Sequence, residues 1–262
     1  MGPARDVIKK VRGLPAGALA LATHRLRRRG LGAAVLCYHD IRTDPAGPTD
    51  YSVTPARLRA HIGWLRQWGY TIVPLAEIVD RLAAGRDLDG LVALTFDDAL
   101  LGVGAEAATI LERLRAPATV FVVTDVLGVD PPFWPGARRT LSDDELRALT
   151  ASGLIRLGSH TTTHASLPAL AADARAHELA ASRAALETMT GAPVEVFAYP
   201  SGHHDAASEA AVRDAGYRAA FTFTFGRVTP TTDRFAIPRF CITEAHDELR
   251  LARQLARPPQ AW

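Results

Sequence analysis

Two short segments carry side chains that could bind a metal ion and move protons. Asp97 and Asp98 are adjacent carboxylates that follow a run of strand-forming residues, 91–96, and His160 and His164 are imidazoles four residues apart. Neighbouring residues at a strand end point to opposite sides of the backbone, so one carboxylate can hold a metal while the other handles protons. The two imidazoles can supply further ligands. The pattern predicts a hydrolase with one metal ion.

Expected strands and helices alternate along the chain, which favours an α/β fold. The expected strands are 33–39, 70–73, 91–96, 118–123, 154–158, 194–198, 217–223 and 235–242. The expected helices are 54–68, 75–84, 104–114, 142–152, 173–190, a segment capped by Asp205 or Ser208 that ends at 215, and 246–255. Thr54 and Ser142 are expected N-caps because their hydroxyls can accept a free backbone N–H. A long Pro- and Gly-rich loop is expected over 125–140.

Candidate site residues fall at the ends of different expected strands. His39, Asp97 with Asp98, His160, and Tyr199 with Pro200 each follow a separate strand. A closed barrel gathers the carboxyl ends of its strands on one face, so this pattern favours a parallel barrel over a doubly wound open sheet. We expect a basic segment over 1–32, helical in conformation, and a single barrel over 33–262.

Three segments resemble, in this order, the first three motifs of the polysaccharide deacetylase family, also called the NodB-homology family or carbohydrate esterase family 4. They are Thr95-Phe96-Asp97-Asp98, His160-Thr161-x-x-His164 and Phe197-Ala198-Tyr199-Pro200-Ser201-Gly202. The resemblance extends from about residue 33 to residue 242. It implies a distorted (β/α) barrel of seven or eight strands that removes the N-acetyl group from an amino sugar, in a polysaccharide or a smaller glycoconjugate.

The resemblance also implies a role for each motif residue. Asp98, His160 and His164 would hold one divalent ion, Zn²⁺ in the first instance, with Co²⁺ or Ni²⁺ as alternatives. Two neutral imidazoles and a carboxylate leave open positions where water is acidified. Asp97 would be the general base. The third motif, Tyr199, Pro200, Ser201 and Gly202, would bind substrate, with the Ser201 backbone N–H facing the oxyanion.

The chain departs from the family pattern at two positions. Ala198 stands where the third motif usually has an arginine that orients the base, and Ala99 stands where a glycine usually follows the aspartate pair. Neither change removes a metal ligand. Arg239 is the candidate replacement for the missing arginine, and a purely structural salt bridge is the alternative interpretation of this residue.

The general acid has to come from an unusual place in the sequence. Many family members use a Leu-x-His segment near the carboxyl terminus, and no such histidine ends a strand here. The segment 35–40, which contains Tyr38 and His39, resembles the circularly permuted branch that includes poly-N-acetylglucosamine deacetylases. His39 is therefore expected to protonate the departing amine. In the long loop, Phe133 and Trp134 either stack on a sugar ring or pack against the barrel rim.

Two other functions remain open on the sequence alone. Related barrels hydrolyse other amides, cyclic ureides or acetyl esters, and a barrel without catalysis could serve as a glycan-binding module. A free carboxylate beside a metal argues against a module that only binds. The net charge of +2 gives no reason to expect a nucleic-acid partner. An N-acetylated carbohydrate is the expected partner, and the oligomeric state is not readable.

The first 30 residues and the two cysteines bear on location. Eight basic residues and one acid precede residue 30, which fits a solvated helix or contact with an anionic membrane surface. Residues 13–22 form a short, Ala- and Gly-rich run that is a weak signal peptide, so export stays an alternative. Cys37 and Cys241 lie in apolar stretches and are expected to be buried free thiols. A cytoplasmic protein, or one peripheral to the membrane, is the expectation.

Overall fold

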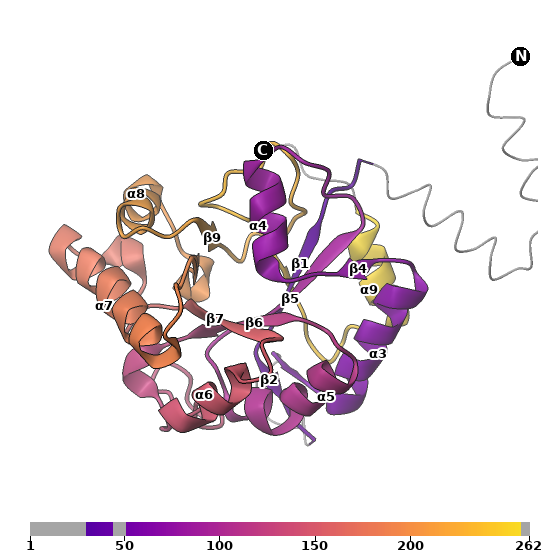
Figure 1. Ribbon diagram of the computed structural model, residues 1–262, viewed down its shortest axis with the longest axis horizontal. Helices are drawn as coiled ribbons and strands as arrows, with labels where there is room; N and C mark the ends of the chain where they lie inside the picture. Colours follow the sequence, from indigo (N-terminus) through magenta and orange to yellow (C-terminus); the bar gives the residue numbers. More distant parts are fainter. Residues whose placement is uncertain (1–29, 44–50, 258–262) are drawn as a thin grey trace, which may run out of the picture.

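The computed structural model of the protein describes residues 30–43 and 51–257 (Figure 1). The expected basic helix therefore lies outside the described residues, apart from the last three positions of the segment 1–32. Within the described ranges, no helix is both long enough and apolar enough to cross a membrane.

A single eight-stranded parallel sheet forms the centre of the molecule. Its order is β10-β1-β5-β6-β7-β8-β9, and β4 pairs with β5 beside this path. The strands are β1 (Ala34–Tyr38), β4 (Thr71–Ile72), β5 (Leu91–Phe96), β6 (Ala118–Val122), β7 (Ile155–Ser159), β8 (Val196–Ala198), β9 (Ala219–Phe221) and β10 (Phe240–Cys241). A separate parallel pair, which the sequence did not predict, consists of β2 (Asp40–Ile41) and β3 (Ser52–Val53).

The sheet curls, and an irregular segment connects its two edges. Phe221 at the end of β9 forms a parallel bridge with Ile237, and the Arg239 backbone N–H donates to the Thr224 carbonyl at 2.9 Å. The chain then enters β10, which pairs with β1. The result is a distorted (β/α) barrel. Only Phe240–Cys241 of the expected strand 235–242 is regular, because Pro238 has no N–H to donate and the backbone leaves one edge to reach the other.

Seven α-helices surround the sheet in the described part of the chain (Figure 1). They are α3 (Pro55–Gln67), α4 (Leu75–Ala83), α5 (Ala108–Arg113), α6 (Asp143–Thr150), α7 (Ala172–Thr190), α8 (Ala206–Asp214) and α9 (Glu248–Leu255). The expected helix over 104–114 begins instead as a π-helix, η1 (Val103–Ala107), and only then becomes α5. Both windings place similar residues inward, so hydrophobic spacing did not distinguish them.

The expected N-caps are present. The side chains of Thr54, Ser142 and Asp205 accept the backbone N–H groups three residues later, at the starts of α3, α6 and α8. At α6 and α8 the third helical residue returns a bond to the cap, which completes two capping boxes. Of the two alternatives for α8, Asp205 is the cap and Ser208 is its partner.

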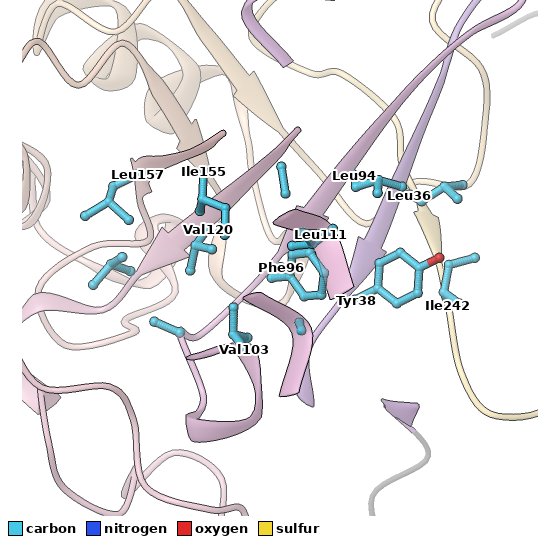
Figure 2. Packing of buried hydrophobic residues seen from close by; sticks show 14 of the residues in the cluster. Leu36, Tyr38, Leu94, Phe96, Val103, Leu111, Val120, Ile155, Leu157 and Ile242 are labelled. Atoms are coloured by element: carbon cyan, nitrogen blue, oxygen red, sulfur yellow. The ribbon is translucent and has the colours of Figure 1, made fainter. Parts of the chain in front are cut away.

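Alternation along the strands divides the core into two layers. Figure 2 shows one layer, in which side chains of β1 and β5 pack with those of the neighbouring helices and strands, among them Leu36, Tyr38, Leu94, Phe96, Val103 and Leu111. The other layer lies on the inner face of the sheet, where Val35, Ala93 and Phe121 pack with α4. Helix α4 lies on the opposite side of the sheet from α5 and α6 (Figure 1). Residues two positions further along the strands, such as 37, 39, 95 and 97, therefore point into the barrel.

Candidate active site

A pocket opens at the carboxyl ends of the strands, where the sequence placed the polar residues. Its volume is about 350 Å³. It is lined by His39, Tyr51, Asp98, Phe133, Trp134, His160, His164, Ser201 and Phe223. Since these residues come from segments far apart in the sequence, the curled sheet brings the site together.

Asp98, His160 and His164 converge at the base of this pocket. Asp98 Oδ1 lies 3.6 Å from His160 Nε2 and 3.5 Å from His164 Nε2, and their three ligand atoms all fall within 4.8 Å of one another. Asp98 Oδ1 is buried and has no hydrogen-bond partner. Burial lowers the pKa of His160 to about 4 and that of His164 to about 3, so both imidazoles are neutral at pH 7. A carboxylate facing two neutral ring nitrogens fits a divalent cation among them.

The charge on Asp98 supports the same interpretation. Burial, and then the negative charge of Asp97, raise the pKa of the Asp98 carboxyl well above its usual range. The ionised group is therefore costly at this position without a positive charge beside it. A cation held by Asp98 and the two histidines would supply that charge.

A backbone contact orients the first of the two histidines, His160. His160 Nδ1 lies 2.7 Å from the Ala198 carbonyl oxygen. A carbonyl oxygen can only accept, so Nδ1 carries the proton and the Nε2 lone pair faces Asp98. His160 follows β7 and Ala198 ends β8, so the pairing of these neighbouring strands sets the direction of the ring.

Glu178 on α7 holds the loop that carries both histidines. Its carboxylate accepts the backbone N–H groups of Thr162 at 2.8 Å and Thr163 at 3.0 Å, and the Thr163 hydroxyl at 2.7 Å. The Thr161 hydroxyl oxygen accepts the His164 N–H at 2.9 Å. Sequence reasoning missed Glu178. No local signal marks it, since it is one acid in a polar helix and only the packing of α7 buries it.

Strained backbone conformations gather around the pocket. Six non-glycine residues in the described chain have positive φ, and five of them are Asp98, Ala99, Thr161, His164 and Ser201. The left-handed conformation costs a non-glycine residue free energy, so it persists only where the surroundings enforce it. At Ala99, where the family pattern has glycine, φ is 50° and the alanine adopts the left-handed region nonetheless.

Asp97 lies beneath the pocket in a buried ion pair with Arg239. Arg239 donates to Asp97 Oδ1 and Oδ2 at 2.7 Å each, and both side chains are fully buried. The guanidinium also donates to the Thr222 carbonyl and lies over the rings of Phe121 and Phe223. Burial alone would raise the pKa of Asp97, but the charge of Arg239 outweighs it and holds that pKa well below its usual range. Asp97 is therefore ionised at neutral pH.

The missing motif arginine is thus replaced in space. Ala198 ends β8 and its small side chain packs on the inner face of the sheet, while Arg239, immediately before β10, extends into the same interior. In the family pattern this arginine would stand at position 198, at the end of β8. Here the guanidinium reaches Asp97 from the segment just before β10. Arg239 therefore forms an ion pair with Asp97. Its role in orienting Asp97 as a base is considered under the proposed function.

His39 is surrounded by aromatic side chains and lines the same pocket as the candidate metal-binding residues. Its ring centroid is 5.0 Å from that of Tyr51, 5.5 Å from Trp134 and 5.6 Å from Phe223. Its Nδ1 is buried without a hydrogen-bond partner, and burial lowers the pKa of His39 to about 4. Trp134 lines the pocket. Phe133 stacks on the His164 ring, with the ring centroids 3.9 Å apart, and also lines the pocket.

The third motif reaches the pocket through one residue only. Tyr199 was expected to contact substrate, but its side chain is fully buried, its hydroxyl donates to the Phe235 carbonyl and its N–H donates to the Phe221 carbonyl. Pro200 has no N–H, and the Gly202 N–H donates back to the Tyr199 carbonyl. Ser201 lines the pocket with a φ of 55°. The tight turn that exposes Ser201 turns its three neighbours away.

Two aromatic residues of the pocket, Tyr51 and Phe223, were not predicted from the sequence. Phe223 follows β9, so an aromatic side chain just beyond a barrel strand was the available signal. Tyr51 precedes β3, a strand that was itself unexpected. A second group, Cys37, His39 and Asp97, also has ligand atoms within 4.8 Å of one another. Arg239 already occupies both oxygens of Asp97 and would repel a cation there.

The fold agrees with the comparison with known proteins. Residues 84–220 match the family model "Polysaccharide deacetylase", and the chain belongs to this family. It is 24% identical over 250 residues to a poly-beta-1,6-N-acetyl-D-glucosamine N-deacetylase of Staphylococcus aureus, covering 91% of this chain and 83% of that one.

Solved structures show the same fold. IcaB from Ammonifex degensii superposes with a TM-score of 0.75 at 27% identity, covering 87% of this chain and 98% of that one. Streptococcus pyogenes deacetylase PplD, solved in complex with acetate, also has a TM-score of 0.75, at 20% identity, with 86% of this chain and 99% of that chain covered.

Proposed function

We propose that this protein is a metal-dependent hydrolase that removes the N-acetyl group from an amino sugar. One observation carries the proposal: the ligand atoms of Asp98, His160 and His164 lie together in the pocket, and Asp98 Oδ1 has no hydrogen-bond partner there. A divalent ion held there, with Zn²⁺ as the first candidate, would polarise the acetyl carbonyl and acidify a water molecule. The related Staphylococcus aureus enzyme acts on an N-acetylated glucosamine polymer, which supports the substrate class.

The pocket suits one acetylated sugar residue. A volume of about 350 Å³ is at the lower end of small-molecule sites, and Tyr51, Trp134 and Phe223 offer ring faces at its walls. Aromatic faces stack against the apolar side of a pyranose ring. The Ser201 N–H is the candidate donor to the developing oxyanion, because Ser201 lines the same pocket as His39 and the candidate metal-binding residues.

Asp97 and His39 are proposed to move the two protons that amide hydrolysis requires. Asp97 is the base: it is ionised, and the two bonds from Arg239 fix the plane of its carboxylate. His39 is the acid. Because burial lowers its pKa to about 4, a proton that reaches His39 is held weakly and passes readily to the departing amine.

The direct test measures metal content and acetate release together. Protein loaded with Zn²⁺ should contain one ion per chain and release acetate from oligomers of N-acetylglucosamine. Asp98→Asn should lose both the ion and activity, whereas Asp97→Asn should keep the ion and lose activity by roughly 10²-fold or more. Acetate release that survives Asp97→Asn would remove Asp97 as the base.

The substrate panel decides between the reactions that this site could catalyse. Acetyl esters and cyclic ureides should be tested beside the amino-sugar acetamides at equal concentrations. If an acetyl ester or a cyclic ureide is hydrolysed faster than all of the acetamides, the enzyme is reassigned to that reaction. Binding of glycans without turnover, under each of Zn²⁺, Co²⁺ and Ni²⁺, would overturn the enzymatic assignment.

A further inference from the structure

A second concavity adjoins the catalytic pocket. Its volume is about 580 Å³ and it runs from β10 to α9, and we call it the α9 groove. Tyr51 and Phe223 line both the groove and the catalytic pocket, so the two spaces adjoin at these side chains. At its inner end the groove reaches Arg239 and Cys241, directly beside Asp97. A ligand held in the pocket can therefore extend into this groove.

Three arginines on and just beyond α9 give the groove a positive wall. Arg250, Arg253 and Arg257 line it, and all three are exposed. Arg250 and Arg253 are three residues apart on α9 and lie on one face of it, and Arg257 follows two residues after the helix ends at Leu255. One acid, Asp247, lines the groove with them, and its carboxylate caps α9 by accepting the Arg250 N–H at 2.8 Å. The exposed lining thus has a surplus of two positive charges, three arginines against one aspartate.

These guanidinium groups are not committed to acids of the protein. Within residues 30–43 and 51–257, none of the three takes part in an ion pair, whereas Arg57, Arg81, Arg138, Arg139, Arg147, Arg183, Arg218 and Arg239 all do. Arg257 lies over the Phe225 ring at 5.2 Å, and Phe225 packs edge-on against Phe240. This stacking leaves the edge of the guanidinium, which carries its N–H donors, open to a ligand.

We propose that the α9 groove binds an anionic group, a carboxylate or a phosphate, carried by the sugar chain whose acetamide lies in the catalytic pocket. This inference rests on the proposed function and narrows its substrate to acidic N-acetylated glycans. Arginine is suited to both anions, because its fork of donors matches their paired oxygens. A glycan is favoured over a membrane surface because the arginines line a hollow that leads to the catalytic residues.

A matched pair of substrates tests the groove. β-1,6-linked oligomers of N-acetylglucosamine, two to five residues long, are converted at the reducing end either to the aldonate or to the alditol. The two products share length and an open-chain end and differ in one negative charge. At the length that places this end in the groove, kcat/KM should favour the aldonate by roughly five-fold, the size expected for one or two exposed charge pairs. The preference should shrink at high salt.

Two triple variants identify the source of the preference. Replacing Arg250, Arg253 and Arg257 by Gln should bring the aldonate-to-alditol ratio close to one. The control replaces Arg59, Arg86 and Arg113 by Gln, which removes the same charge from exposed arginines outside the groove, and it should keep the wild-type ratio. Calorimetric binding of the two oligomers answers the same question without turnover, so it still tests the groove if neither oligomer is hydrolysed.

The outcomes separate this inference from the proposed function. Release of acetate from both oligomers at equal efficiency at every length overturns the groove assignment and leaves the deacetylase standing. Equal loss of preference in both triple variants overturns it as well, because the effect is then long-range charge. A ratio near one, together with sedimentation on vesicles of anionic phospholipid that is lost only in the α9 variant, would assign the arginines to a membrane surface instead. Failure of both oligomers to release acetate counts against the deacetylase.

Discussion

Asp97 and Asp98 are chemically identical neighbours that their surroundings make different. Asp97 faces the guanidinium of Arg239, which holds its pKa below the usual range, and Asp98 faces two neutral imidazoles, with its pKa raised. Their side chains point to opposite sides of the chain at the end of β5. One carboxylate is therefore prepared to stay charged, and the other requires a cation to be charged.

Removing the charge of Arg239 should destabilise the protein strongly. Arg239→Met leaves Asp97 buried without its partner, and we expect the free energy of unfolding to fall by about 3 to 5 kcal/mol. Urea denaturation with a chelator present measures this without a contribution from bound metal. A loss below about 1 kcal/mol would contradict the pairing.

The same substitution should reverse one pH dependence. In the wild type, the folded pKa of Asp97 is below the unfolded value of about 4, so its stabilisation is present above pH ~4 and is lost as the pH falls through the folded pKa. In Arg239→Met, burial is unopposed and the folded pKa rises above ~4, so stability falls as the pH rises from ~4. The double variant with Asp97→Asn should lack this slope.

His39 can be tested by the leaving group it serves. His39→Gln should slow acetamide hydrolysis by roughly 10² to 10⁴-fold, because the amine must leave protonated. Hydrolysis of 4-nitrophenyl acetate, whose leaving group departs as an anion, should slow far less. Equal losses on both substrates, with metal content unchanged, would assign His39 a positioning role.

At the scale of elements, the site is built from short segments that leave the strands in strained turns. Asp98, Ala99, Thr161, His164 and Ser201 all have positive φ. Such conformations need support from elsewhere, and α7 provides it for the histidine loop through Glu178. The aromatic loop between β6 and α6 is tied to the barrel by Arg138, whose guanidinium pairs with Asp40 at 2.8 Å.

Loss of Glu178 should weaken metal binding without touching a ligand. Glu178→Ala frees the N–H groups of Thr162 and Thr163, and we expect the affinity for Zn²⁺ to fall by about 10 to 100-fold, as for other residues that orient metal ligands. Competition with a chromogenic chelator measures the affinity. Asp173→Ala, an exposed acid of the same helix, is the control and should bind Zn²⁺ as the wild type does.

At the scale of the molecule, the barrel interior has two parts. It is apolar where the strands pack against α4, and it carries charged and polar side chains near the carboxyl ends of the strands. Four histidines, His39, His61, His160 and His164, are neutral inside this fold because burial lowers their pKa values to between about 3 and 4. In the unfolded chain they titrate near ~6.5. The folded state therefore binds fewer protons than the unfolded state throughout the range between.

Acid should consequently unfold the protein well above pH 4. The unfolded state takes up protons as the pH falls from ~6.5, so the free energy of unfolding should drop by several kcal/mol between pH 7 and pH 5, more steeply with Zn²⁺ bound. His164→Gln should flatten this slope, and the exposed His177→Gln should not. A flat profile from pH 7 to pH 5 would contradict the neutral state of these rings.

The sequence by itself determined most of the strands and helices and the candidate set of metal-binding residues. The caps of α3 and α6 and the bounds of β5 follow from local patterns, because each depends on residues near one another in the chain, and the motif resemblance grouped Asp98 with His160 and His164. The sequence also proposed that Arg239 orients Asp97, with a purely structural salt bridge as the alternative.

Only the tertiary structure decided what each residue faces. The contact of Arg239 with Asp97, the support from Glu178, the withdrawal of Tyr199 from the pocket and the arginines of α9 beside it all depend on how distant strands and helices meet. Such pairings are set by the curl of the sheet and by strand register, to which every element contributes. The spacing of residues within one segment does not predict these contacts between distant segments.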